Sequence, residues 1–221
     1  MVSHVIFDLD GTLVDSRRDI AISVNHMLAG YGLATLPLDV IESYVGSGAR
    51  RLVRSALGTE AAGFDIDECV KVFRAHYLDH CLDTTRAFPG IAALLAALKG
   101  RGLSLAVVTN KPTAMSRRIL EGLGLRAFFD VVIGGDDDAT MKPDPSPAAA
   151  VFARTGGSPV TTLMVGDSTI DLGFARAVGM KCVLVGFGGI SDTAELRAAG
   201  AEWFCETPEA LVALLLRVPI L

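Results

Sequence analysis

Paired cysteines are missing from this 221-residue chain. Its four cysteines are scattered, and no two have the CxxC spacing of a zinc ribbon or a redox pair. We therefore expect reduced, partly buried thiols, as in a cytoplasmic protein. The C-terminal apolar segment at 211–221 is too short to span a membrane and contains Arg217. The start of the sequence lacks the basic and apolar segments of a signal peptide, so we expect a cytoplasmic protein that acts without a membrane.

The chain also lacks an excess of basic residues. The sequence holds 20 lysines and arginines against 25 aspartates and glutamates, a formal net charge of −5. Nucleic-acid binding usually requires basic patches, so we expect no nucleic-acid partner. Hydrophobic residues make up 51% of the chain, enough for a sizeable core. Length and composition together favour one α/β unit with a small insertion.

Apolar segments alternate with helical patterns over most of the chain. Strands are predicted at 5–9, 103–109, 131–135, 161–167, 181–187 and 201–204, and helices at 91–100, 112–124 and 145–157. Continuous apolar strands between helices indicate a Rossmann-like parallel sheet with helices on both faces, the 5–9 strand being central. Ligands of such sheets bind beyond the carboxyl ends of the strands.

One stretch interrupts this alternation. Residues 16–84 contain no convincing buried strand, but helical patterns occur at about 17–30, 39–57 and 66–81. The stretch is too long for an ordinary loop between a strand and a helix. We predict a catalytic core formed by residues 1–15 and 85–221, with residues 16–84 inserted as a helical cap domain.

The most informative motif follows the first strand. Asp8 and Asp10 lie one residue apart where Val5–Phe7 gives way to a loop. Two close carboxylates repel each other unless a cation or a shared proton relieves them, and a hard divalent cation prefers such oxygen ligands. Asp8 is placed to attack phosphorus as a covalent nucleophile. Asp10 is placed to act as acid and then as base.

Three further strand ends carry polar residues. The Thr109 hydroxyl and the Asn110 backbone N–H can hold phosphoryl oxygens, although a plain turn with a helix cap fits them too. Lys142 can offset the carboxylates and a phosphoryl dianion, although an isolated lysine is usually solvated. Asp167 is a candidate metal ligand and Asp171 a more distant carboxylate, while the same segment also fits a helix N-cap.

The chain resembles the haloacid dehalogenase superfamily of phosphohydrolases over nearly its whole length, and within it the phosphoglycolate phosphatase group. The segments that carry the resemblance are DLDGTLVDS (8–16), YVGSGARRLVRSAL (44–57), FPG (88–90), TNK (109–111), GGDDDATMKPDPSP (134–147) and VGDSTIDLGFARAVG (165–179). The triple aspartate 136–138 within them fits a solvated loop, with a supporting place near the metal as the alternative.

The resemblance implies a role for each matching residue. Asp8 is the nucleophile, Asp10 the general acid and base, and Thr109, Asn110 and Lys142 bind the phosphoryl group. A Mg²⁺ ion is held by Asp8, Asp167 and the backbone carbonyl of Asp10. The remaining implied substrate-binding residues are those of a cap loop: Gly46, Ser47, Gly48 and Arg50. A helix-capping turn with a solvated Arg50 is the alternative for that loop.

These features predict a Mg²⁺-dependent phosphatase that forms an aspartyl phosphate. The expected partner is a small phosphorylated metabolite, 2-phosphoglycolate first of all, and the protein is a monomer or homodimer. Pyrophosphate, nucleotides and amino-sugar phosphates are the other phosphatase substrates considered. A phosphomutase acting on a sugar phosphate is the second function, because it would use the same two aspartates. A non-catalytic binding module is disfavoured by the complete set of motif residues.

Overall fold

A six-stranded parallel sheet forms the centre of the molecule. The computed structural model describes residues 1–136 and 140–217. In sheet order the strands are β5 (Val131–Ile133), β4 (Ser104–Val108), β1 (His4–Phe7), β6 (Thr162–Gly166), β7 (Lys181–Val185) and β8 (Trp203–Cys205). Every neighbouring pair is parallel, and β1 lies between β4 and β6. The predicted α/β fold with a parallel sheet is confirmed.

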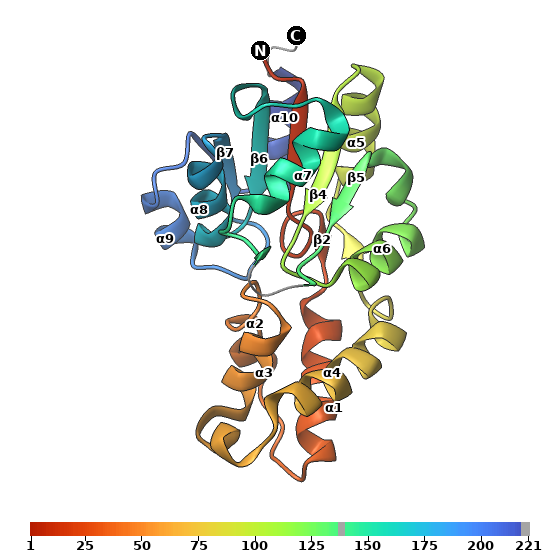
Figure 1. Ribbon diagram of the computed structural model, residues 1–221, viewed down its shortest axis with the longest axis vertical. Helices are drawn as coiled ribbons and strands as arrows, with labels where there is room; N and C mark the ends of the chain where they lie inside the picture. Colours follow the sequence, from red (N-terminus) through yellow and green to blue (C-terminus); the bar gives the residue numbers. More distant parts are fainter. Residues whose placement is uncertain (137–139, 218–221) are drawn as a thin grey trace.

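Alternate side chains of each strand enter two separate apolar layers. Val5 and Phe7 belong to one buried cluster, and Ile6 belongs to the other. The first cluster includes α5 (Ile91–Gly100), α6 (Thr113–Gly122) and α10 (Pro208–Arg217). The second includes α7 (Ser146–Thr155), α8 (Thr169–Val178) and α9 (Thr193–Ala198). The sheet is therefore covered by helices on both faces, as the continuous apolar strands predict (Figure 1).

Four helices gather at one end of the molecule, next to the end of the sheet at which β1 finishes (Figure 1). We call them the cap helices: α1 (Arg17–Gly30), α2 (Leu38–Glu42), α3 (Ala49–Leu57) and α4 (Ile66–His80). The helix predicted at 39–57 is wrong as a single element. It is split into α2 and α3 because Gly46 and Gly48 adopt φ angles of 103° and 86°, which no right-handed helix contains. The assignment of residues 16–84 to a separate domain stays a prediction. Within the described residues, no helix has the length and apolar character needed to cross a membrane.

A short two-stranded ribbon, absent from the sequence prediction, carries the chain into and out of the cap helices. It pairs β2 (Val14–Asp15) with β3 (Arg86–Ala87) in antiparallel fashion. Beside it, the buried Asp19 carboxylate accepts the backbone N–H groups of Thr84 and Thr85 at 2.9–3.1 Å, and both threonine hydroxyls at 2.5 and 2.7 Å. Asp19 thus fastens the two connections to each other.

Replacing Asp19 by Asn should destabilise the fold. Burial by itself raises the pKa of Asp19, but the donors of Thr84 and Thr85 outweigh it and lower the pKa. A lowered carboxyl pKa means that the stabilisation is present above the unfolded pKa of about 4 and is lost as the pH falls through the folded pKa. We expect Asp19→Asn to cost about 2–3 kcal/mol at pH 7. Urea unfolding at pH 7 and at about pH 3 checks this, and an equal cost at both would contradict the assigned role of the charge.

Candidate active site

Three strands that are neighbours in the sheet end in buried polar residues. Asp8 follows β1, Thr109 follows β4 and Asp167 follows β6. All three side chains are buried. Because the carboxyl ends of parallel strands meet at one edge, these residues converge on a single site facing the cap helices.

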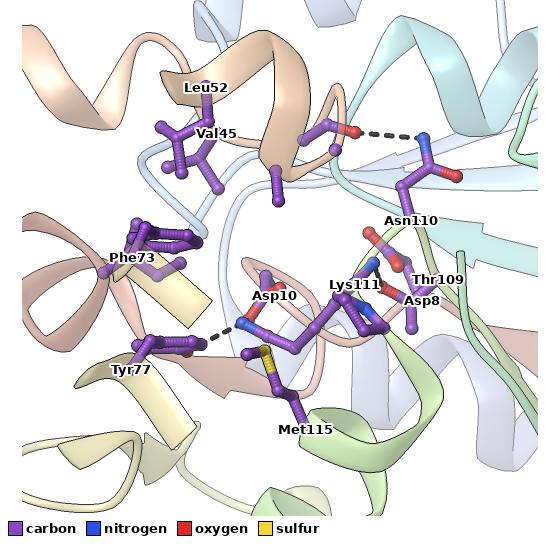
Figure 2. Close-up of a pocket in the computed structure, with 15 residues that line it drawn as sticks. Asp8, Asp10, Val45, Leu52, Phe73, Tyr77, Thr109, Asn110, Lys111 and Met115 are labelled. Atoms are coloured by element: carbon purple, nitrogen blue, oxygen red, sulfur yellow. Dashed lines mark hydrogen bonds and ion pairs between the residues drawn. The ribbon is translucent and has the colours of Figure 1, made fainter. Parts of the chain in front are cut away.

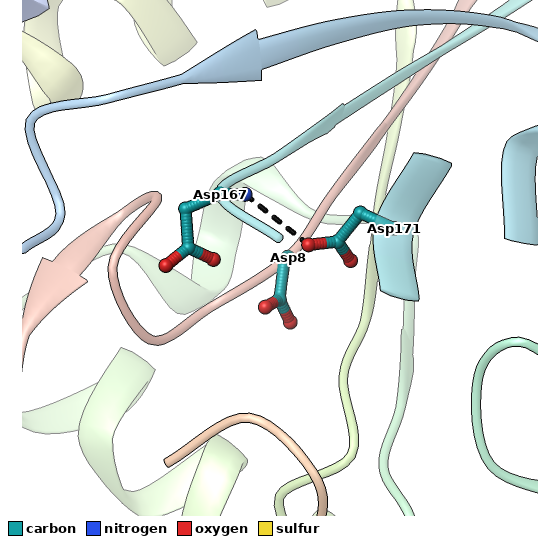
Figure 3. A group of neighbouring side chains, drawn as sticks. All are labelled: Asp8, Asp167 and Asp171. Atoms are coloured by element: carbon teal, nitrogen blue, oxygen red, sulfur yellow. Dashed lines mark hydrogen bonds between the residues drawn. The ribbon is translucent and has the colours of Figure 1, made fainter. Parts of the chain in front are cut away.

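The aspartates at this edge form a tight carboxylate cluster (Figure 3). One oxygen from each of Asp8, Asp167 and Asp171 lies within 4.8 Å of the other two. Burial raises the pKa of Asp8 to about 6; Lys142 opposes the rise, and neighbouring carboxylates add to it. Burial, with the charges of Asp171 and Asp8, also raises the pKa of Asp167 well above its usual range. So much clustered negative charge requires a positive partner.

The donor set fits a hard divalent cation such as Mg²⁺. Asp167 Oδ2 is buried, and no described residue forms a hydrogen bond with it. Gly11 passes so close that a Cβ at this position would lie 2.1 Å from Asp167 Oδ2, and its φ of 74° also favours glycine. A small cation that prefers oxygen ligands requires such a place: a buried carboxylate oxygen without a partner, a second carboxylate beside it and a backbone that approaches closely. Asp8 and Asp167 are the carboxylates that could hold it.

Asp171 is engaged elsewhere. Its Oδ1 accepts from Lys142 Nζ at 2.6 Å, and its Oδ2 accepts from the backbone N–H groups of Asp167 and Ser168 and from the Ser168 hydroxyl. Ser168 and Asp171 form a capping box at the start of α8, so the N-cap alternative for this segment is confirmed. Lys142 Nζ also lies 2.9 Å from Asp8 Oδ1. Asp171 therefore holds the lysine against Asp8.

Asp10 has different partners. Its carboxylate accepts a hydrogen bond from the Ser16 hydroxyl and lies 2.9 Å from Lys111 Nζ. Its carboxylate is not one of the three whose oxygens lie within 4.8 Å of one another. The sequence prediction assigned no role to Lys111 or Ser16. Lys111 belongs to the TNK segment, so only its position next to Thr109 and Asn110 could have drawn attention to it.

Asn110 connects the core to the cap loop. Its Nδ2 donates to the carbonyl of Gly46, between α2 and α3, and to the carbonyl of Lys142, both at 3.1 Å. Thr109 Oγ1 accepts the backbone N–H of Lys111 at 3.2 Å. The predicted loop residue Gly46 thus lies directly over the strand ends.

A small cavity opens between these residues and the cap helices (Figure 2). It has a volume of about 50 Å³. Asp8, Asp10, Thr109, Asn110 and Lys111 line its core side. The cap side is largely apolar and consists of Ile20, Val45, Gly46, Gly48, Ala49, Leu52, Phe73 and Tyr77. We call this the leaving-group pocket, because it is lined by Asp8, the expected nucleophile, and by Asp10, the expected acid for the leaving group.

Two of the predicted cap-loop residues lie elsewhere. Ser47 and Arg50 line a second hollow of about 470 Å³, together with Arg51, Arg54 and Lys142. Arg50 forms an ion pair with the exposed Asp67. In the acidic loop, Asp136 accepts the backbone N–H of Thr113 at 2.8 Å, whereas Asp137 and Asp138 lie outside the described residues.

Comparison with known proteins decides the family. The model of the haloacid dehalogenase-like hydrolase family matches residues 5–185. The chain belongs to this family. The resemblance stated from the motifs is therefore confirmed, and so is the prediction of an enzyme, at the level of a hydrolase.

Relatives of this haloacid dehalogenase-like hydrolase cover almost its whole length. A Cupriavidus necator protein named "Phosphoglycolate phosphatase, plasmid" is 40% identical over 213 residues, which cover 96% of this chain and 92% of the relative. A phosphoglycolate phosphatase of Aquifex aeolicus is 36% identical and covers 87% and 88% of the two chains. The crystal structure of a predicted phosphoglycolate phosphatase from Haemophilus somnus matches with a TM-score of 0.83 at 28% identity, over 96% of this chain and 97% of that one.

Proposed function

We propose that this hydrolase is a Mg²⁺-dependent phosphatase whose substrate is 2-phosphoglycolate. The observation that carries the proposal is the carboxylate cluster of Asp8, Asp167 and Asp171 with Lys142 held against Asp8. A dianionic phosphoryl group could enter such a site only with cations beside it, and the site offers a buried lysine and the ligands for a metal. The names of the relatives support the substrate.

In the proposed reaction, Asp8 attacks phosphorus while the oxygen of the leaving alcohol takes a proton from Asp10. The resulting aspartyl phosphate is attacked by water, which gives its proton back to Asp10. Products are the alcohol and inorganic phosphate. Mg²⁺ bound by Asp8, Asp167 and the carbonyl of Asp10 would neutralise the charge that collects on the phosphoryl oxygens.

The remaining residues bind and enclose the substrate. Thr109 and Asn110 would donate to the phosphoryl oxygens, and Lys142 would balance their charge, as electrostatic catalysis requires. Gly46 and Gly48 border the leaving-group pocket. Ser47 and Arg50 would border the approach of the substrate through the second hollow. Residues 16–84 would act as a cap domain that excludes bulk water.

The test is a phosphate-release screen over phosphorylated metabolites with and without Mg²⁺. We expect 2-phosphoglycolate to be hydrolysed with the highest kcat/KM, activity to vanish in excess chelator, and activity to return when Mg²⁺ is restored. Pyrophosphate, nucleotides and amino-sugar phosphates serve as the competing substrates. Full turnover in chelator would refute the metal site. Isomerised sugar phosphate without free phosphate would instead indicate a mutase.

Size-exclusion chromatography with light scattering would test the proposed monomer or homodimer. We further propose that the enzyme works in the cytoplasm, as the four unbridged, buried cysteines favour.

A further inference from the structure

Lys111 is a buried lysine in the wall of the leaving-group pocket. It follows β4 and precedes α6, and its side chain is only 5% exposed. Its backbone N–H donates to Thr109 Oγ1, and its carbonyl accepts the backbone N–H of Gly135 at 3.0 Å and the Ser116 hydroxyl at 3.3 Å. Three contacts thus fix the point from which the side chain extends into the pocket.

The Lys111 ammonium has two polar partners. Its Nζ donates to the Tyr77 hydroxyl at 2.7 Å and lies 2.9 Å from Asp10 Oδ1 (Figure 2). Burial favours the neutral amine, but the charge of Asp10 and the Tyr77 hydroxyl outweigh it, so the pKa of Lys111 is raised and the cation persists. An ammonium group has three N–H donors. Two are directed at these partners, which leaves one for a ligand.

The surroundings give this charge particular weight. Among the described residues that line the leaving-group pocket, Lys111 is the one cation, whereas Asp8 and Asp10 are acidic. Much of the remaining wall is apolar, including Leu52 and Phe73. A cavity of about 50 Å³ suits a small leaving group, such as a two-carbon unit that ends in a carboxylate. Against so much apolar wall, a bound anion is favoured only where a cation pairs with it.

We propose that Lys111 is the specificity-determining residue of this enzyme, whose ammonium group binds the carboxylate of the leaving group. The inference rests on the proposed phosphatase function and deepens it. Tyr77, which comes from cap helix α4, holds the ammonium group in place through its hydroxyl and through its ring, whose centre is 4.5 Å from Nζ. The carboxylate site therefore exists where cap and core meet. Arg50, which the resemblance implies is a substrate-binding residue, lines the second hollow instead and is paired with Asp67.

The experiment compares two esters with the same two-carbon chain, 2-phosphoglycolate and ethyl phosphate, in which a methyl group replaces the carboxylate. The measured quantity is the ratio of their kcat/KM values. Loss of the contact between Lys111 and Asp10 would slow the hydrolysis of both esters. Loss of a contact with the substrate carboxylate would slow only that of 2-phosphoglycolate. We expect Lys111→Met to lower the ratio about 10- to 100-fold, as expected for a charge-assisted hydrogen bond. The Ki of the product glycolate should rise by a similar factor.

Two further variants sharpen the comparison. Lys111→Gln replaces the cation by a neutral polar group, should lower the ratio in the same direction, and serves if Lys111→Met does not fold. Arg50→Ala removes the competing cation; because Arg50 lines the second hollow and not the leaving-group pocket, any loss in this variant should fall equally on both esters. A fall of the ratio in Arg50→Ala but not in the Lys111 variants would overturn the proposal.

The outcomes also distinguish the role of Lys111 from the proposed phosphatase function. A wild-type enzyme that prefers 2-phosphoglycolate, with variants that lose equally on both esters, would overturn the role of Lys111 and leave the proposed function standing. A wild-type enzyme that hydrolyses both esters equally would overturn the role of Lys111 and the proposed substrate together. A wild-type enzyme that releases no phosphate from either ester would refute the phosphatase function itself.

Discussion

Asp8→Asn is expected to abolish phosphate release, with kcat reduced by at least about 10⁴-fold. The neutral amide of asparagine cannot act as the nucleophile that forms an aspartyl phosphate. The substitution also removes a proposed metal ligand. Asn has nearly the same shape as Asp, so the packing at the end of β1 should survive. Steady-state phosphate release at saturating Mg²⁺ and 2-phosphoglycolate measures the loss.

A matched control is available in the same chain. Asp39 is an exposed carboxylate at the start of α2. Asp39→Asn makes the same chemical change at a residue that lines neither cavity and should keep wild-type turnover. Circular dichroism and thermal melting would show whether Asp8→Asn is folded. Retention of more than about a tenth of the wild-type kcat in folded Asp8→Asn would contradict the assignment of the nucleophile.

The second large effect is expected for Asp10→Asn. Asparagine can neither give a proton to the leaving alcohol nor accept one from water, so both steps should slow. For an alkyl ester such as 2-phosphoglycolate we expect kcat to fall about 10²- to 10⁴-fold. The metal should still bind, because the proposed contact from this residue is its backbone carbonyl.

The choice of substrate separates the two roles of Asp10. An aryl phosphate has a leaving group that needs no protonation, so its first step should be far less impaired in Asp10→Asn. Hydrolysis of the aspartyl phosphate remains slow because the base for water is missing, and phosphoenzyme should accumulate. Rapid-quench measurements with both substrates test this. Equal losses in the first step for the aryl and alkyl esters would show that Asp10 is not the acid.

The sequence predicted the sheet and the strand-end residues because both depend on local patterns. Continuous apolar strands specify a parallel sheet, and a parallel sheet brings Asp8, Thr109 and Asp167 to one edge. The prediction of one helix over 39–57 was wrong because it gave the apolar spacing more weight than the two glycines. In the fold, the positive φ angles of Gly46 and Gly48 break it.

The partners of each charge could not be predicted in the same way. Lys111 meets Asp10 where β1 and β4 lie side by side, and it meets Tyr77 only where cap helix α4 covers the strand ends, across separations that no local spacing encodes. Arg50 follows the Gly-Ser-Gly loop closely in the sequence. In the structure, however, its side chain lines the second hollow and pairs with Asp67. Motifs thus located the proposed reaction centre, while the proposed contact of Lys111 with the leaving group required the tertiary structure.

The most direct test of the central claim is to identify the residue that carries phosphate during turnover. Wild-type enzyme mixed with excess 2-phosphoglycolate and Mg²⁺ would be acid-quenched within a single turnover, digested and analysed by mass spectrometry. The account predicts one added phosphoryl group on the peptide that contains Asp8, lost on treatment with base and absent from Asp8→Asn. A phosphoryl group on any other residue, or the same modification in Asp8→Asn, would contradict it.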